Sequence, residues 1–110
     1  MFKRIAFFEG FIAQGREVEF DEYINERLVP LWTQFPGATR VEILREVEAE
    51  DGSHRYPLVL QTTYPDREAM ENALASRVRF ESREMTKGLL AMFLGRVFHV
   101  VYELKDFVTA

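Results

Sequence analysis

Two hydrophobic periods alternate along this chain, and their order restricts the fold more than any other feature of the sequence. Residues 2–12 are rich in aromatic and β-branched side chains, and both alternating faces of the strand that they predict are largely apolar. Residues 17–35 instead place apolar side chains three and four positions apart, which predicts a helix. Pro30 lies inside that helix and cannot donate to the carbonyl of Glu26, so we expect a kink or a restarted last turn there.

A predicted hairpin occupies the middle of the chain. Residues 38–48 alternate between apolar and polar side chains, as a half-buried strand does. The dipeptide Asp51-Gly52 then predicts a turn, after which an antiparallel strand runs from about residue 54 to residue 64. The large even-numbered side chains of this strand are expected to share one face: Tyr56, Leu58, Leu60 and Tyr64.

A second helical zone and a last strand follow. Asp66 can cap the helical zone, which breaks at Ser76 and ends at Gly95. Residues 96–104 alternate again, and both faces of the strand that they predict are mostly apolar. The order of elements predicts an α+β, ferredoxin-like βαββαβ fold in one domain, residues 1–110. It has a four-stranded antiparallel sheet, in the order 4-1-3-2, with both helical zones on one face.

The second face of that sheet needs a cover. Helices can cover only one face, yet the first and last strands are apolar on both. Exposed apolar patches on monomers seldom exceed roughly a few hundred Å². We therefore predict an obligate homodimer in which the sheet faces of two copies pack together. The alternative is a strand register that differs by one residue, which would exchange every side chain between the faces.

Charge and composition narrow the function classes. Eighteen Asp and Glu against fourteen Lys and Arg leave a net charge of −4, which argues against nucleic-acid binding and a polybasic membrane role. Without cysteine there are no disulfides, thiol catalysis or Cys-ligated metals, and His54 and His99 fall on separated strands, so we expect no metal site and no cofactor. No membrane-spanning run or signal-peptide pattern is present, so we expect a soluble, cytoplasmic protein.

Several short segments resemble the EthD-like branch of the dimeric α+β barrel superfamily. They are FDEYINERLVPL at 20–31, FPGA at 35–38, ALAS at 73–76 and GRVFH at 95–99, so the resemblance spans most of the chain. It implies a ferredoxin-like subunit whose sheets pair into a barrel, with a small cleft between each sheet and its own helices. It also implies chemistry on small, often aromatic molecules, as in ether degradation, cofactor-independent monooxygenases, lactone isomerases and polyketide-tailoring enzymes.

One position departs from the EthD-like pattern. That pattern usually has a histidine two residues before the Pro-Leu pair, and this chain has Leu28 there. Leucine cannot accept a proton, so an acid-base role carried by that histidine is absent or moved to another residue.

His99 and Tyr23 are the candidate catalytic residues. His99 is either a hydrogen-bonded interface residue or a base in the cleft. Tyr23 has a hydroxyl that needs a partner if it is buried, so it is also a candidate for orienting a polar group of a ligand.

Four further residues are candidate ligand contacts: Arg27, Leu28, Trp32 and Tyr64. Arg27 follows Tyr23 by one helical turn and can meet an anionic substrate, although an arginine on a helix flank is more often solvated. Aromatic side chains such as Trp32 and Tyr64 more often belong to the core than to a ligand pocket.

The leading functional hypothesis is an EthD-like small-molecule-binding protein or cofactor-independent enzyme. Such an enzyme would be of the monooxygenase, isomerase or dehydratase type and would act on a small apolar or aromatic metabolite. The alternative is a non-catalytic ligand-binding or stress-associated homodimer, which the leucine at position 28 favours. A third hypothesis is a structural partner within a pathway complex.

Overall fold

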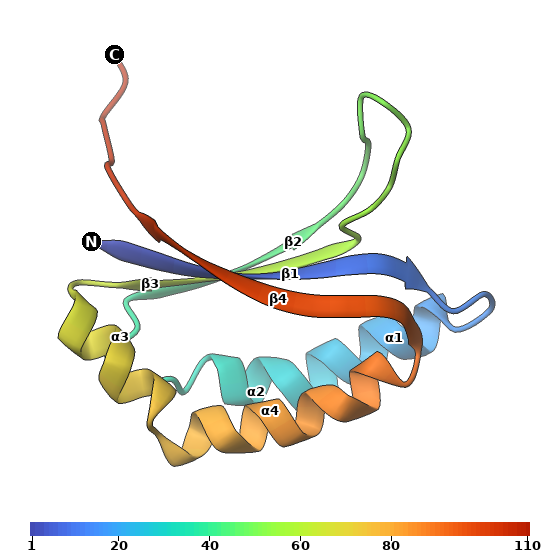
Figure 1. Cartoon of the computed structure of the whole chain (residues 1–110), viewed down its shortest axis with the longest axis horizontal. Coiled ribbons are helices and arrows are strands. Elements are labelled where there is room, and N and C mark those ends of the chain that lie inside the picture. Colours follow the sequence, from blue (N-terminus) through green and yellow to red (C-terminus); the bar gives the residue numbers. More distant parts are fainter.

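The computed structural model describes residues 1–110 and contains one sheet packed on one layer of helices (Figure 1). The predicted order of elements and the ferredoxin-like arrangement are confirmed. The elements are β1 (Phe2–Ile12), α1 (Glu17–Tyr23), a π-helical turn (Ile24–Leu28), α2 (Val29–Trp32), β2 (Arg40–Arg45), β3 (Leu58–Tyr64), α3 (Arg67–Leu74), α4 (Arg77–Leu90) and β4 (Phe93–Glu103).

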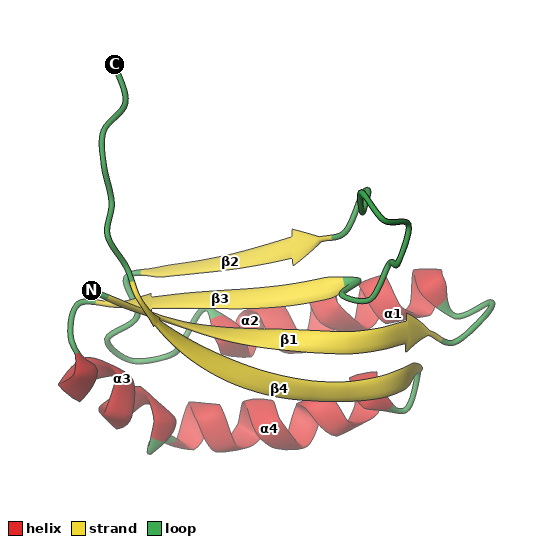
Figure 2. Ribbon diagram, turned by 45° about the horizontal axis from the view of Figure 1, so that its top comes forward, coloured by secondary structure: helices red, strands yellow, loops and turns green.

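The sheet has the predicted strand order, and all neighbouring strands are antiparallel. β1 lies in the interior of the sheet between β3 and β4, so both of its edges are hydrogen-bonded to neighbouring strands (Figure 2). The β2–β3 register pairs Arg45 with Leu58 and Val41 with Thr62, so it is centred on the Asp51-Gly52 turn. The turn prediction therefore gives the register of the hairpin correctly.

The hairpin strands are shorter than predicted, because strand pairing stops well before the turn. Residues 46–57 form a long loop instead. Pro57 has no N–H to donate to a ladder, and His54 adopts a positive φ of 51°, which is incompatible with a strand. The irregular loop also moves Tyr56 to the other face of the sheet, where its ring meets Phe7 edge-on at 5.7 Å. The prediction that Tyr56 shares a face with Leu58 is wrong.

The first helix changes its hydrogen-bonding pattern just before Pro30, as the sequence led us to expect. A π-helical turn spans Ile24–Leu28, and an α-helix restarts at Val29. A proline ring clashes with the carbonyl four residues earlier, and a wider turn removes that clash. Because the turn still buries Ile24 and Leu28, the helix keeps its apolar face on the core.

The second helical zone is divided by caps. The Asp66 carboxylate accepts the Ala69 N–H at 2.8 Å, and the Ser76 hydroxyl accepts the Arg79 N–H at 3.2 Å. The two caps begin α3 and α4 separately, at the predicted break. Helix α4 then runs beside α2 beneath the sheet (Figure 1).

No element of the chain covers the second face of the sheet (Figures 1 and 2). The Phe7 and Phe98 rings stack there at 5.4 Å, and Phe11, Leu94 and Tyr102 are 59%, 66% and 47% exposed. The loop 46–57 and the C-terminal segment 104–110 both extend away from the helices on this side (Figure 1). None of the helices is long and apolar enough to cross a membrane.

Candidate ligand cleft

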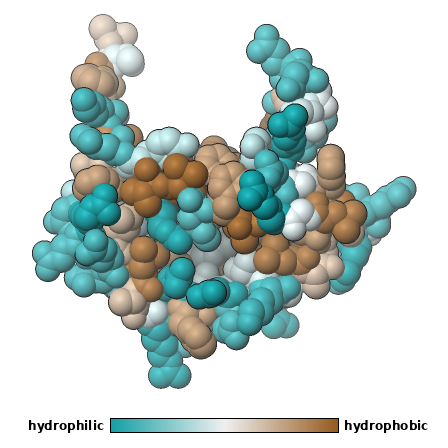
Figure 3. Space-filling view, viewed as in Figure 1, coloured by the Kyte–Doolittle hydropathy of each residue, from teal (hydrophilic) through white to brown (hydrophobic).

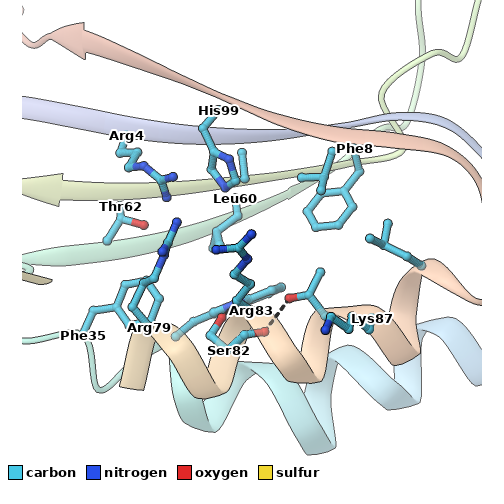
Figure 4. A pocket seen from close by; sticks show the side chains of 15 residues that line it. Arg4, Phe8, Phe35, Leu60, Thr62, Arg79, Ser82, Arg83, Lys87 and His99 are labelled. Atoms are coloured by element: carbon cyan, nitrogen blue, oxygen red, sulfur yellow. Dashed lines mark hydrogen bonds between the residues drawn. The ribbon is translucent and has the colours of Figure 1, made fainter. Parts of the chain in front are cut away.

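A cavity of about 410 Å³ lies between the sheet and helices α2 and α4. It is visible as a hollow in the centre of the molecule in Figure 3 and from close by in Figure 4. We call it the central cleft. Its lining comes from strands β1, β3 and β4, helices α2 and α4, and the loop after α2: Arg4, Ala6, Phe8, Trp32, Phe35, Leu60, Thr62, Arg79, Ser82, Arg83, Thr86, Lys87, Leu90, Val97 and His99.

The sheet forms one wall of the central cleft through alternate residues of its strands. Arg4, Ala6 and Phe8 of β1 point to this side, because successive side chains of a strand face opposite ways. His99 is paired with Ala6 in the β1–β4 ladder, so it stands beside the smallest residue of the wall. The methyl side chain of Ala6 leaves space that a larger residue would fill.

Helix α4 forms the opposite wall through one of its faces. The lining residues of α4 are spaced by three and one in turn, which keeps them on a single side of a helix: Arg79, Ser82, Arg83, Thr86, Lys87 and Leu90. The indole N–H of Trp32 donates to the Ser82 hydroxyl at 3.0 Å, and both side chains are buried. This bond fixes the Trp32 ring against α4 at the floor of the cleft.

The charge of the cleft is opposite to that of the chain. Its lining includes Arg4, Arg79, Arg83 and Lys87 but no Asp or Glu, in a chain of net charge −4. Lys87 pairs with Glu84 at 2.7 Å, whereas none of the three arginines takes part in an ion pair. Burial and the nearby charge of Arg79 both lower the pKa of Arg4.

His99 is neutral in this environment. Its ring projects from β4 toward Arg4 and the arginines of α4 (Figure 4). Loss of surrounding water, followed by the charges of Arg4 and Arg79, lowers the pKa of His99 from 6.5 to about 4. A neutral imidazole has one nitrogen that accepts a hydrogen bond or a proton. The cleft therefore combines hydrogen-bond donors of fixed charge with one proton acceptor.

Of the six residues that the sequence suggested, His99 and Trp32 line the central cleft. Tyr23 does not, because its hydroxyl donates to the Met85 carbonyl at 2.8 Å where the ring crosses α4 at Gly88. Leu28 is fully buried in the core.

The other two suggested residues also lie outside the cleft. Tyr64 is buried against Met70 and Ala73, and burial raises its pKa although Arg4 partly offsets the shift. Arg27 lies in a separate surface groove beside Pro30.

Sequence reasoning missed the basic residues of the cleft, although two signals were present. Arg4 is the one charged residue among the apolar even-numbered positions of β1. Arg79, Arg83 and Lys87 are four residues apart, which places them on one helix face. The second signal is equally typical of a solvated helix, so it identifies a site only when the opposite wall is known.

His54 and His99 lie in different parts of the structure, since His99 lines the central cleft. His54 lies on the loop 46–57, where its Nδ1 is 2.7 Å from a Glu46 carboxylate oxygen. No group of three or more His, Cys, Asp or Glu side chains is placed to hold a metal ion.

Comparison with solved structures identifies many chains of the same fold. An EthD family protein from Bacillus halodurans C-125 has a TM-score of 0.74 at 22% identity, over 96% of this chain and 99% of the other. SnoaB, a cofactor-independent oxygenase from Streptomyces nogalater, has a TM-score of 0.67 at 18% identity, over 99% and 97%. A dimeric ferredoxin-like protein of unknown function from Jannaschia sp. CCS1 has a TM-score of 0.66 at 21% identity, over 94% and 98%.

No family model and no curated protein matches the chain. The solved structures are nevertheless similar over nearly the whole length of both partners. They confirm the predicted ferredoxin-like fold, and an EthD family protein is among the structures that share it.

Proposed function

We propose that this protein binds a small molecule in the central cleft and acts on it without a resident cofactor. The cleft itself carries the proposal, because its volume of about 410 Å³ and its mixed lining suit a small ligand. Sites for small molecules are typically apolar concavities of roughly 300–1,000 Å³ with a few convergent polar groups. Phe8, Trp32 and Leu90 offer the apolar wall for an aromatic or aliphatic body.

His99 is the residue that we assign to proton transfer. It lines the cleft, and as a neutral imidazole it accepts a proton from an acidic C–H or O–H group of the ligand. The likeness of fold to a protein described as a cofactor-independent oxygenase supports chemistry of this kind. We assign no proton-transfer role to Tyr23, whose hydroxyl is engaged by Met85 outside the cleft.

The working form that we propose is a homodimer joined through the uncovered sheet face. Phe7, Phe98 and Tyr102 leave apolar surface on that face. Two segments that extend on the same side carry exposed apolar residues, among them Val47 and Phe107. A second copy would cover these residues, and solved structures of similar fold are described as dimeric.

Ligand-observed NMR with 2-naphthamide and 2-naphthoate tests whether the central cleft is the binding site. Thr86 lines the cleft, so Thr86→Phe fills it, whereas Arg77→Phe adds the same ring to the solvent face of α4, where the Arg77 side chain is 91% exposed. We expect binding of at least one probe to be lost in Thr86→Phe and kept in Arg77→Phe. Equal binding by the two variants, or binding of neither probe to the unmodified protein, would contradict the proposal.

Ligand binding without catalysis is the second candidate function. Leu28 favours it, because this fully buried leucine stands where the EthD-like pattern has a histidine and offers no proton acceptor. Native mass spectrometry of the purified protein distinguishes the two functions through the ligand that copurifies. A ligand whose mass changes, or whose NMR spectrum changes at constant mass as in an isomerisation, on incubation with the unmodified protein but not with His99→Gln indicates catalysis. An unchanged mass and an unchanged spectrum with both proteins indicate binding alone.

A further inference from the structure

We propose that the central cleft selects a small organic acid, whose anionic group is held between Arg4 and Arg79 and whose apolar body lies against Phe8 and Trp32. The inference rests on the proposed function, since it requires that the cleft binds a small molecule. It goes further by assigning the chemical class of the ligand and its direction in the cleft.

The first argument is the missing countercharge. Arg4 and Arg79 come from opposite walls and point toward one another, and neither has a carboxylate partner (Figure 4). Burial is the main cause of the lowered pKa of Arg4, and the charge of Arg79 lowers it further, so the two guanidinium groups repel each other in the empty protein. An anion between them removes the repulsion and forms charge-assisted hydrogen bonds to both planar guanidinium groups.

The second argument is the direction of the charge gradient. Along β1 the lining changes from Arg4 through Ala6 to Phe8, a span of four residues or roughly 13 Å at the rise of a strand. Figure 4 shows Arg79 of α4 on the side of Arg4 and Lys87 on the side of Phe8, and the lining residue Leu90 follows Lys87 at the end of α4. The lining of α4 therefore changes in the same direction as that of β1. Lys87 lies nearer the apolar end, but Glu84 already neutralises it. A ligand with one charged end and one apolar end matches both walls at once.

The third argument concerns size. The four cations line a cavity, whereas the chain as a whole carries a net charge of −4. A long polyanion such as a nucleic acid meets that overall negative charge, while a small anion enters the cleft and meets only its positive lining. The charge pattern therefore favours a small acid over a nucleic acid.

The test compares 2-naphthoate with 2-naphthamide, which match in size and ring system and differ in charge. Isothermal titration calorimetry should give a dissociation constant for naphthoate that is lower by about tenfold or more, as expected for hydrogen bonds to charged groups. The preference should shrink as ionic strength rises. Inorganic phosphate, an anion without an apolar body, should bind more weakly than naphthoate.

Variants of α4 provide matched controls. Arg79→Gln should remove most of the naphthoate preference, because it weakens naphthoate binding more than naphthamide binding, whereas Arg77→Gln on the solvent face should change neither affinity. Equal affinity for the two naphthalene probes in the unmodified protein would overturn the assignment of an acid while leaving the cleft as a ligand site. Phosphate binding as tight as naphthoate binding would contradict the claim that the ligand has an apolar body. Binding of neither naphthalene probe would overturn the proposed function together with this inference.

Discussion

The guanidinium groups of Arg4 on β1 and Arg79 on α4 face each other across the central cleft, and no carboxylate of the chain pairs with either. Some exposed arginines elsewhere find partners, such as Arg16 with Glu19 and Arg77 with Glu81, whereas exposed Arg27, Arg55 and Arg67 do not. What distinguishes Arg4 and Arg79 is that both are partly buried and face each other in a cleft without a carboxylate. Uncompensated charge of this kind is typical of sites where a ligand supplies the opposite charge.

The repulsion between Arg4 and Arg79 in the empty cleft should lower the free energy of unfolding of the protein. Arg79→Met removes the repulsion with Arg4 and keeps an unbranched side chain of similar length, so the free energy of unfolding should rise by roughly 0.5–2 kcal/mol. Arg77→Met is the control, because it removes only an exposed pair with Glu81 and should lower that free energy by at most about 1 kcal/mol. Urea denaturation measures both. A greater loss of stability in Arg79→Met than in Arg77→Met would show that the two cleft arginines do not repel.

Stability should also depend on the protonation of His99. Its pKa is about 4 in the folded protein against 6.5 ordinarily, so between these pH values the unfolded chain binds more protons than the folded one. The free energy of unfolding should therefore fall as the pH drops from 6.5 to 4 and gain nothing from His99 above 6.5. Denaturation across this range should show a shallower dependence in His99→Gln, and an unchanged slope would contradict the low pKa.

An acid bound in the cleft should raise the pKa of His99. Desolvation and then the charges of Arg4 and Arg79 lower that pKa in the empty protein, and the carboxylate offsets the two charges. NMR titration of the imidazole signals, assigned with His99→Gln, measures the shift with and without 2-naphthoate. The amide probe should leave the pKa nearer its value in the empty cleft, and an equal shift with both probes would point to desolvation instead of charge.

Gly88 should be required for the packing of Tyr23 against α4. A Cβ at position 88 would overlap the Tyr23 hydroxyl oxygen. Gly88→Ala should therefore destabilise the protein by roughly 1–3 kcal/mol through overpacking, despite the roughly 1 kcal/mol by which alanine favours a helix interior. In a Tyr23→Ala background the clash is gone, so the same substitution should be neutral or stabilising. A cost of equal size in both backgrounds would place the strain elsewhere.

Charge on the uncovered sheet face should weaken the homodimer. Val100 pairs with Ile5 on that face, so Val100→Lys places a cation in the proposed interface. Val18→Lys is the control on α1, where Val18 is 71% exposed. Light scattering over a dilution series should find dimers of the unmodified protein and of Val18→Lys at concentrations where Val100→Lys dissociates. A monomeric unmodified protein at micromolar concentration would contradict the pairing.

Hydrophobic periodicity was sufficient to predict the order of elements, and turn chemistry set the hairpin register. Asp51-Gly52 fixes where β2 and β3 align, because a turn between paired strands determines which residues meet. Periodicity did not show that the β2–β3 pairing ends at Arg45 and Leu58. The pairing ends there because of backbone properties, the missing N–H of Pro57 and the positive φ of His54, which a pattern of side-chain hydrophobicity does not report. Because residues 46–57 form a loop and not a strand, Tyr56 lies on the opposite face of the sheet from the one predicted.

The sequence predicted the fold more completely than it predicted the residues of the central cleft. His99 stands out as a titratable residue on a central strand position, and Trp32 follows from the helix that covers the sheet. The cation cluster depends on β1 and α4 facing each other across the central cleft, and no local sequence pattern encodes the distance between these two elements. Tyr23 looked suited to catalysis because its hydroxyl needs a partner, and a backbone carbonyl of α4 is that partner.

A crystal structure of the protein grown with 2-naphthoate tests the central claim most directly, because it locates the ligand and gives its direction in one measurement. The expected result is one naphthoate in the central cleft of each subunit, with its carboxylate within hydrogen-bonding distance of Arg4 and Arg79 and its rings beside Phe8 and Trp32. A cleft that stays empty at saturating ligand, or a naphthoate whose carboxylate points toward Phe8 and Leu90, would contradict it.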